Sequence, residues 1–141
     1  MNTDNITIDK ITSRNLKTLH PKDKLIRAKE IFNEYDIHHI PVHVMGDIRG
    51  IISLGDILFL EGFTNNTFDE FLKNKKLQLA TVDEVMTSHP YCADVDDLLS
   101  EVLDVMLDKR VNAMPVKEND ELVGIVTTFD ILNYFKKVLN D

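Results

Sequence analysis

Apolar residues along this chain recur in patterns that predict the same series of helices and strands twice. In residues 25–35 and again in 98–109, apolar side chains return every three or four positions, which predicts an amphipathic helix in each stretch. Each helix is followed by a short apolar strand, a polar turn and a second apolar strand, which together predict a hairpin. A second helix follows each hairpin, from about residue 55 to 60 and from about 128 to 139. The first strand of each hairpin contains a proline, Pro41 or Pro115, which predicts an edge position or a strand start.

The two series are copies of one unit without gaps between matching residues. Pro41, Gly50 and Asp56 match Pro115, Gly124 and Asp130 at one constant spacing, and apolar residues fill the positions between them in both copies. Such a repeat is evidence of a duplicated structural unit. We therefore predict an α/β (α+β) fold of tandem β-α-β-β-α repeats, the first over residues 8–60 and the second over 82–137.

Residues 61–81 lie between the repeats and have a composition of their own. Phe68, Phe71 and Leu72 stand among Asn and Lys at a spacing that suits one short amphipathic helix. We interpret the segment as a linker helix that covers the core. The alternative is a partner-docking insertion that extends from Phe63 to Leu79.

Composition excludes several classes of function. The 141 residues are 43% hydrophobic and 28% charged, as in a globular protein, and the net charge of −8 disfavours nucleic acid as a partner. No signal peptide begins the chain, and no apolar run approaches the roughly 18–20 residues of a membrane span. Cys92 is the single cysteine, so no internal disulfide can form and a cytoplasmic location is expected.

Enzyme and metal chemistry are poorly supported by the residues present. No nucleophile-base-acid set and no P-loop occurs, so we expect no catalysis. His39 and His43 would share a strand face about 13 Å apart, with His38 on the opposite face, so one ion could not gather all three. We therefore expect no metal site and no required cofactor.

The two copies resemble a pair of CBS domains (cystathionine β-synthase type repeats), and the resemblance covers nearly the whole chain. An apolar-Pro-Val strand and a Gly-apolar-apolar-Ser/Thr-x-x-Asp junction carry it in each copy. The matching segments are His39–Val42, Gly50–Asp56, Ala113–Val116 and Gly124–Asp130. Val82–Thr87 also looks like the opening of such a repeat, and its first-copy counterpart, Ile8–Ser13, is a weaker match.

The resemblance implies a fold and a function. In the family, two repeats pack by their sheets around a pseudo-twofold axis as a Bateman module, leave two clefts, and commonly dimerise into a disc. Many members bind AMP, ADP, ATP or S-adenosylmethionine in the clefts and regulate another protein, for example in energy sensing. We therefore expect a stand-alone, non-catalytic sensor that forms a homodimer. A ligand-free scaffold that dimerises or docks a partner is the alternative.

Four residues at the strand-to-helix junctions are the first candidates for a ligand site: Ser53, Asp56, Thr127 and Asp130. Free N–H groups and the helix dipole favour an anion at such a junction, and a carboxylate can accept hydrogen bonds from ribose hydroxyls. By resemblance, the aspartates hold ribose and the hydroxyls contact ribose or phosphate. The same Ser/Thr-x-x-Asp spacing also fits a capping box, which needs no ligand.

The segments before each proline are the second group of candidates. Extended backbone there can read an adenine edge while aliphatic side chains enclose the ring. Resemblance points to Ile37, His38, His39 and Ile40 in the first copy, to Val111, Asn112, Ala113 and Met114 in the second, and to Thr18 and Cys92 near the start of each repeat. Core packing is the alternative for Ile37, Ile40, Val111 and Met114. In the family, the acid of one copy faces the pre-proline segment of the other.

The two predicted sites are not equivalent. A protonated His38 or His39 suits a phosphate, whereas the second copy has Asn112 and Ala113 at these positions. Lys109 and Arg110 are the basic residues that could compensate there, with a solvated helix face as the alternative interpretation. The two sites should therefore differ, and one of them is expected to be weak or empty.

Overall fold

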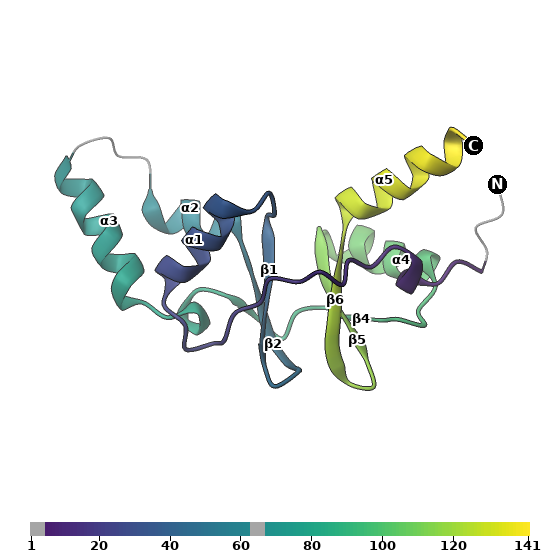
Figure 1. Ribbon diagram of the computed structural model, residues 1–141, viewed down its shortest axis with the longest axis horizontal. Coiled ribbons are helices and arrows are strands. Elements are labelled where there is room, and N and C mark those ends of the chain that lie inside the picture. The colour runs from purple at the N-terminus through teal and green to yellow at the C-terminus, as the bar shows by residue number, and fades with distance from the viewer. Residues whose placement is uncertain (1–4, 63–66) are drawn as a thin grey trace. The chain divides into compact units, whose positions relative to one another are not determined.

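The computed structural model describes residues 5–62 and 67–141, which belong to two compact units. The central unit is Lys17–His89, and the split unit combines Met1–Leu16 with Pro90–Asp141. Figure 1 follows the chain from its purple start to its yellow end. The compact units differ from the sequence repeats, because the start of the chain folds with the second repeat.

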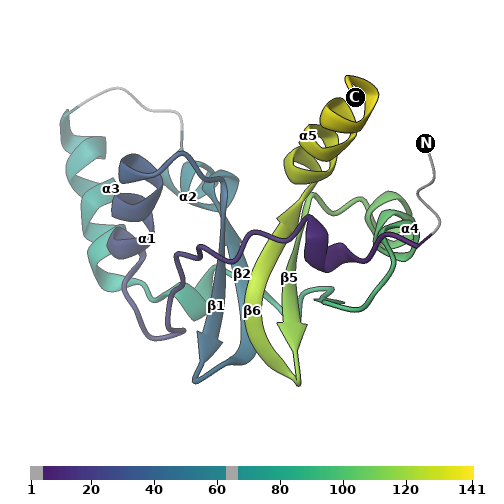
Figure 2. The ribbon, with the colours of Figure 1, turned by 45° about the vertical axis from the view of Figure 1, so that its right-hand side comes forward.

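The central unit holds the elements of the first repeat and a sheet in the order β1-β2-β3. Strands β1 and β2 form an antiparallel hairpin, and β3 pairs antiparallel with β2. The helices α1 and α2 lie between α3 and the hairpin in both views (Figures 1 and 2). The elements are α1 (Leu25–Glu34), β1 (His39–Val44), β2 (Asp47–Ser53), α2 (Leu54–Glu61), α3 (Thr67–Leu79), a 3-10 helix (Val82–Glu84) and β3 (Thr87–Ser88).

The split unit repeats this plan around a sheet in the order β4-β5-β6. Strand β4 pairs parallel with β5, and β5 forms an antiparallel hairpin with β6. The elements are a 3-10 helix (Ile8–Lys10), β4 (Ala93–Asp94), α4 (Leu99–Lys109), β5 (Ala113–Glu118), β6 (Glu121–Thr127) and α5 (Thr128–Leu139).

Both hairpins have the predicted position and close through two-residue turns. Met45 and Gly46 have φ of 50° and 90°, and Asn119 and Asp120 have φ of 53° and 64°. Two central residues with positive φ give the turn whose twist matches the flanking strands. The pairing register of the two strands also shifts at the same point in both copies, between Val42 and His43 and between Val116 and Lys117. The duplication therefore preserves the backbone in detail.

Each unit has its own apolar core, built by the predicted periodicities. In the central unit, Leu25, Ala28 and Ile31 of α1 pack with buried residues of the hairpin. In the split unit, Leu99, Val102 and Met106 of α4 pack with buried residues of its own hairpin. Burial of one face of each helix against one face of a sheet is the main stabilising contribution in such a fold.

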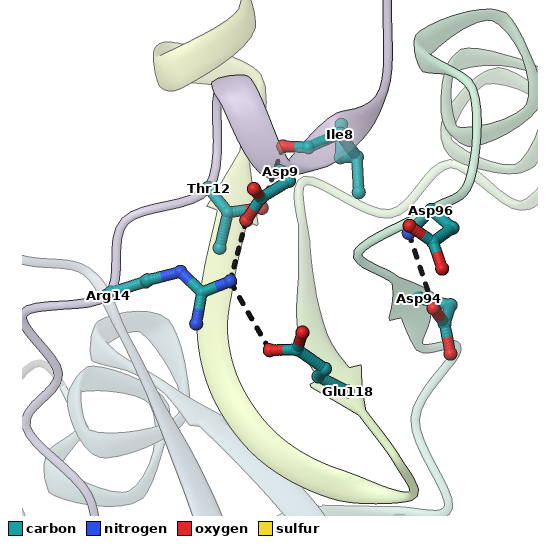
Figure 3. A network of polar contacts seen from close by, with 7 residues as sticks. All are labelled: Ile8, Asp9, Thr12, Arg14, Asp94, Asp96 and Glu118. Carbon is teal, nitrogen blue, oxygen red and sulfur yellow. Dashed lines mark hydrogen bonds and ion pairs between the residues drawn. The ribbon is translucent and has the colours of Figure 1, made fainter.

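The opening segment of each repeat packs in the other unit. Ser13 exchanges backbone hydrogen bonds with Ile125 at 2.9 and 3.0 Å, and the fully buried Ile8 belongs to the split core. Arg14 pairs with Asp9 at 2.7 Å and Glu118 at 3.5 Å, which joins this segment to the end of β5 (Figure 3). Sequence repeats and folding units therefore have different boundaries.

A glycine in each hairpin makes room for the opening segment that comes from the other repeat. A Cβ at Gly124 would lie 2.3 Å from Cγ2 of Thr12 and 2.8 Å from the carbonyl oxygen of Ser13. At Gly50, it would lie 2.5 Å from Sδ of Met86 and 2.7 Å from the carbonyl oxygen of Thr87. The glycine of the junction motif thus has a packing role in both copies.

The prolines occupy matching positions in the two copies. Pro115 lies in β5, between β4 and β6, and Pro41 lies in β1, whose outer side carries the corresponding parallel bridge between Leu19 and Val42. The expectation of an edge or strand start was wrong for Pro115. A proline is tolerated in this inner strand because β4 is only two residues long. It pairs Ala93 with Val116, one residue beyond Pro115, so the N–H that proline lacks falls outside that short ladder.

Helix α3 occupies most of the segment between the repeats. Its Leu77 is fully buried in the central core, and its last turn is tied down where the N–H of Leu25 donates to the carbonyl of Ala80 at 3.0 Å. Phe63, part of the predicted docking segment, lies outside the described residues. No helix in residues 5–62 and 67–141 is long and apolar enough to cross a membrane.

Candidate functional site

The junction residues form the capping box that their spacing predicted. The N–H of Asp56 donates to Oγ of Ser53 at 3.1 Å, and the N–H of Ser53 donates to Oδ2 of Asp56 at 2.8 Å. In the other unit, the N–H of Asp130 donates to Oγ1 of Thr127 at 3.2 Å, and the N–H of Thr127 donates to Oδ2 of Asp130 at 2.9 Å. The capping interpretation is therefore confirmed for both pairs.

Capping leaves part of each aspartate available. The contacts of both carboxylates use Oδ2, and no contact from the described residues reaches Oδ1 of Asp56 or Asp130. Both side chains are half-buried at the first turn of a helix. A carboxylate held in one rotamer with a free oxygen is suited to accept a hydrogen bond from a ligand hydroxyl at little entropic cost.

The pre-proline segment of each repeat lies beside the capping box of the same repeat. The N–H of Leu54 donates to the carbonyl of His38 at 2.9 Å, and the N–H of Thr128 donates to that of Asn112 at 2.9 Å. His38 and Asn112 are exposed. The structure thus brings the two predicted groups together within each unit. That the acid of one copy faces the pre-proline segment of the other remains a prediction.

His39 is a poorer cation than predicted. Burial lowers the pKa of His39 below its ordinary 6.5, the neighbouring His38 lowers it further, and Asp56 opposes both effects. The imidazole therefore holds its proton less readily than an exposed histidine, which weakens its candidacy as a protonated partner of a phosphate.

Several pre-proline side chains belong to the core. Ile40 and Met114 are 0% and 2% exposed, and Ala113 is also buried. Ile37 and Val111 are partly buried and pack against the core of their units. Core packing, the alternative weighed for four of these residues, thus accounts fully for the side chains of Ile40 and Met114.

Val111 and Asn112 also line a pocket between α4 and α5. Its volume is about 680 Å³, within the range of small-molecule sites, and most of its walls are aliphatic. The remaining lining residues are Leu103, Met106, Leu107, Arg110, Thr128, Ile131 and Leu132. Sequence reasoning did not single out Leu103, Leu107 and Leu132. Leu103 and Leu107, four apart on α4, were the signal for an apolar strip beyond the core stripe.

Thr18 and Cys92 hold equivalent positions but make different contacts. Oγ1 of Thr18 lies 3.2 Å from Nε2 of His43, whereas Sγ of Cys92 donates to the carbonyl of Pro90 at 3.3 Å. Burial raises the pKa of the Cys92 thiol, and the nearby Lys117 opposes this effect. A thiol with a raised pKa is a weak nucleophile at neutral pH.

The histidines do not gather for a metal. Among residues 5–62 and 67–141, no three His, Cys, Asp or Glu side chains stand close enough to hold an ion.

Comparison with known proteins identifies the family. The CBS domain model matches twice, at residues 8–61 and 82–137. The chain belongs to the CBS-domain family. The CBS pair covers most of the chain, and its two matches correspond to the two repeats of the duplication.

One curated relative of this CBS pair is an enzyme, and the match covers only part of it. The chain is 30% identical over 126 residues to the inosine-5'-monophosphate dehydrogenase of Methanocaldococcus jannaschii. The matched segment makes up 88% of this chain but only 22% of the dehydrogenase. An uncharacterized protein of the same organism, MJ1225, is 26% identical over 94% of the chain and 48% of its own length. The chain thus spans between a fifth and a half of these relatives.

Solved structures share the CBS-pair fold. The CBS domain pair of protein MJ0100, in complex with 5'-methylthioadenosine and S-adenosyl-L-methionine, is 26% identical, with a TM-score of 0.72 over 92% of this chain and 99% of that one. CBSX2 of Arabidopsis thaliana, in a complex with AMP, is 20% identical, with a TM-score of 0.77 over 94% of this chain and 97% of that one. The predicted fold is therefore confirmed.

Proposed function

We propose that this CBS pair is a non-catalytic regulatory module that binds an adenosyl ligand beside Ser53 and Asp56 and beside Thr127 and Asp130. The observation that carries the proposal is the capped aspartate with an unused Oδ1 in each unit. The candidate ligands are AMP, ADP, ATP and S-adenosylmethionine. No resident cofactor is needed for such a role.

The chemistry of the junction supports ribose recognition. The cap fixes the carboxylate through Oδ2, which leaves Oδ1 to accept hydrogen bonds from a sugar hydroxyl. A helix N-terminus next to it favours the negative charge of a phosphate. The structure of MJ0100 with two adenosyl compounds supports the same ligand class for this relative.

The two sites are expected to prefer different ligands. The first offers the exposed His38, whereas the second offers Asn112 and the aliphatic pocket between α4 and α5. His38 is thus the basic side chain at the first site, whereas at the second site Arg110 lines the pocket and the aliphatic walls add apolar contact. One site can be weak or empty for any one ligand.

Exposed apolar side chains support a homodimer of this module. Leu58 and Phe59 of α2 are 54% and 87% exposed, and Phe129 and Leu132 of α5 are 73% and 69% exposed. Large apolar side chains left exposed to this degree are typical of protein-protein contact surfaces. To regulate a partner protein, the ligand must bind one conformation more tightly than another. We place this function in the cytoplasm.

Thermal melting with AMP, ADP, ATP and S-adenosylmethionine tests the ligand class. A ligand at 100 times its dissociation constant adds about 2.7 kcal/mol to the stability. Unchanged melting with all four compounds would instead favour the ligand-free scaffold.

Substitution of the aspartates tests the site. Asp130→Ala is expected to weaken binding at the second site by roughly 1–3 kcal/mol, through the lost ribose contacts, with Asp56→Ala acting at the first. Asp104→Ala, which removes an exposed acid from α4, controls for the change in charge. Calorimetry that finds full affinity in the double variant Asp56→Ala/Asp130→Ala contradicts the proposed role of both aspartates.

A further inference from the structure

His43 connects the turn of the first hairpin to Thr18. Its Nδ1 accepts a hydrogen bond from the N–H of Gly46 at 2.9 Å, and its Nε2 lies 3.2 Å from Oγ1 of Thr18. A backbone N–H can only donate, so Nδ1 carries the lone pair and the proton of the neutral imidazole is on Nε2. Nε2–H therefore donates to Oγ1. These contacts, from Gly46 through His43 to Thr18, form the His43 relay.

The relay fixes the role that is left to the Thr18 hydroxyl. A hydroxyl has one hydrogen and two lone pairs, and His43 uses one of the lone pairs. Within residues 5–62 and 67–141, the imidazole is the only hydrogen-bond partner of Oγ1, so no acceptor takes the hydroxyl hydrogen. A hydroxyl that already accepts a hydrogen bond is a stronger donor, because the two bonds polarise each other.

Thr18 lies on the face of β1 that points away from the core. The N–H of Leu19 donates to the carbonyl of Pro41 at 3.1 Å, and Leu19 forms a parallel bridge with Val42, so Thr18 is level with Pro41. Leu19 and Val42 are both buried in the central core. Because side chains alternate along extended backbone, Thr18 and Pro41 face the opposite way.

The first proposed ligand site begins on the same face. His39 precedes Pro41 by two residues and therefore shares its face. Burial lowers the pKa of His39, and the Asp56 carboxylate is close enough to oppose that shift. Thr18 is thus displaced from His39 by about 7 Å along the strand, at 3.3 Å per residue. A nucleotide held by Asp56 is long enough to span that distance.

We propose that His43 is a positioning residue of the first adenosyl site, which orients the Thr18 hydroxyl to donate a hydrogen bond to an acceptor atom of the bound ligand. The inference rests on the proposed function and specifies one of its contacts. A ligand that presents a nitrogen or oxygen lone pair to Thr18 is favoured over one that presents an N–H group, because the N–H would leave the hydroxyl hydrogen unpaired.

The split unit lacks such a relay. The equivalent positions hold Cys92 and Lys117. Sγ of Cys92 donates to the carbonyl of Pro90 at 3.3 Å, and Nζ of Lys117 lies 3.9 Å from Oδ1 of Asp120. The single hydrogen of the thiol is therefore used within its own loop. The positioning effect is expected at one of the two sites only.

Two substitutions of His43 separate its two contacts. In His43→Asn, the amide oxygen takes the place of Nδ1 and can accept from Gly46, but the donor to Thr18 is lost. In His43→Gln, the longer side chain brings its amide nitrogen near the position of Nε2, so the donor is kept and the acceptor is lost. Calorimetry with AMP, in an Asp130→Ala background that weakens the second site, measures the effect of each.

His43→Asn is expected to weaken AMP binding about fivefold, whereas His43→Gln should bind nearly as well as the parent chain. An unchanged affinity in His43→Asn, or an equal loss in both variants, would limit His43 to the turn and overturn the proposal.

A double-mutant cycle shows whether His43 acts through Thr18. Thr18→Val removes the hydroxyl with little change of shape and is expected to weaken AMP binding about fivefold, while Thr18→Ser keeps the donor and most of the affinity. Once residue 18 is valine, His43→Asn should cause no further loss. Additive losses would mean that His43 influences the ligand by another route, and the proposal would be wrong.

His20 provides a matched control. Its Nδ1 also accepts from a backbone N–H, that of Lys22 at 3.0 Å, but no side chain or carbonyl in the described part of the chain contacts its Nε2. His20→Asn should therefore leave AMP binding unchanged. A loss as large as that of His43→Asn would trace both effects to the stability of the central unit and overturn the proposal.

Nitrogen NMR of the wild-type imidazole tests the relay without a ligand. At mildly alkaline pH, where an imidazole is neutral, the chemical shifts of His43 should show a protonated Nε2 and an unprotonated Nδ1. The opposite tautomer would contradict this inference alone. A chain with the expected tautomer that binds neither AMP nor S-adenosylmethionine would instead contradict the proposed function, and with it the role of His43 at a ligand.

Discussion

The central and split units share one backbone plan but differ in the contacts between their two helices, α1 with α2 and α4 with α5. In the central unit, Nζ of Lys29 on α1 donates to Oε2 of Glu61 on α2 at 2.9 Å, and α3 covers α1 through Leu77. In the split unit, the positions equivalent to Lys29 and Glu61 are Leu103 and Phe135, which pack against the core. The pocket of about 680 Å³ lies between α4 and α5 of this second unit.

The residues that the two copies retain are those that fix the backbone. Both keep the proline, the close-packed glycine and the capping aspartate, because each meets a geometric demand that few other side chains satisfy. The side chains that line surfaces have changed, as the pair His38 and Asn112 shows. The duplication therefore preserved a scaffold and allowed the two binding surfaces to differ.

The largest effect that we expect comes from the glycines that the units share. Gly124→Ala should destabilise the protein by roughly 2–3 kcal/mol, because the new Cβ meets Cγ2 of Thr12 and the Ser13 carbonyl. Gly50→Ala should cost less, since part of its clash is with Sδ of the flexible Met86. Urea unfolding measures both changes in free energy.

Gly55→Ala is the control for the glycine pair. A Cβ at this position meets Oγ of Ser53 at an ordinary 3.6 Å, and the residue lies in the first turn of α2. Alanine there should be neutral or slightly stabilising. If Gly124→Ala is as harmless as Gly55→Ala, the exchanged opening segment does not hold its position on β6.

A smaller effect should come from the ion pair that distinguishes the central unit. The side chains of Lys29 and Glu61 are 28% and 18% exposed, so solvent screens the pair in part. A double-mutant cycle with Lys29→Met and Glu61→Gln should give a coupling energy of about 0.5–1 kcal/mol, reduced at high salt. Zero coupling energy at low salt would mean that α1 and α2 are held together by apolar packing, without a contribution from this ion pair.

The smallest effect is a pH dependence confined to the central unit. Folding lowers the pKa of His39 from its ordinary 6.5, so the unfolded chain binds the proton more tightly than the folded one. The stability contributed by neutral His39 is complete above the unfolded pKa and is lost as the pH falls through the folded pKa. His39→Gln should therefore lose less stability than the wild type between pH 8 and mildly acid pH in thermal melts.

Ala113, which occupies the equivalent position in the split unit, offers the matching control. It carries no titrating group, so Ala113→Ser should leave the pH dependence of melting unchanged. If the melting temperature of His39→Gln changes with pH in parallel with that of the wild type, burial of this imidazole does not contribute to the pH dependence of stability.

The sequence alone determined the duplication, the order of elements and the capped junctions. Helical and strand periodicities located the hairpins and cores, because burial of one face leaves a regular trace in the sequence. The Ser/Thr-x-x-Asp spacing predicted both capping boxes, since that motif closes within four consecutive residues. The proposed ligand site rests on the same local signals and on the likeness of the chain to CBS pairs.

Tertiary structure alone decided which unit each opening segment joins and which face of α3 turns outward. Ser13 pairs with Ile125, and Gly50 faces Met86, through contacts between residues far apart in the chain, which no periodicity encodes. Leu77 was one of several apolar residues in α3 until packing buried it and left Phe68 exposed. Local patterns specify elements because their hydrogen bonds are local, whereas the pairing of surfaces depends on which distant segment fills each space.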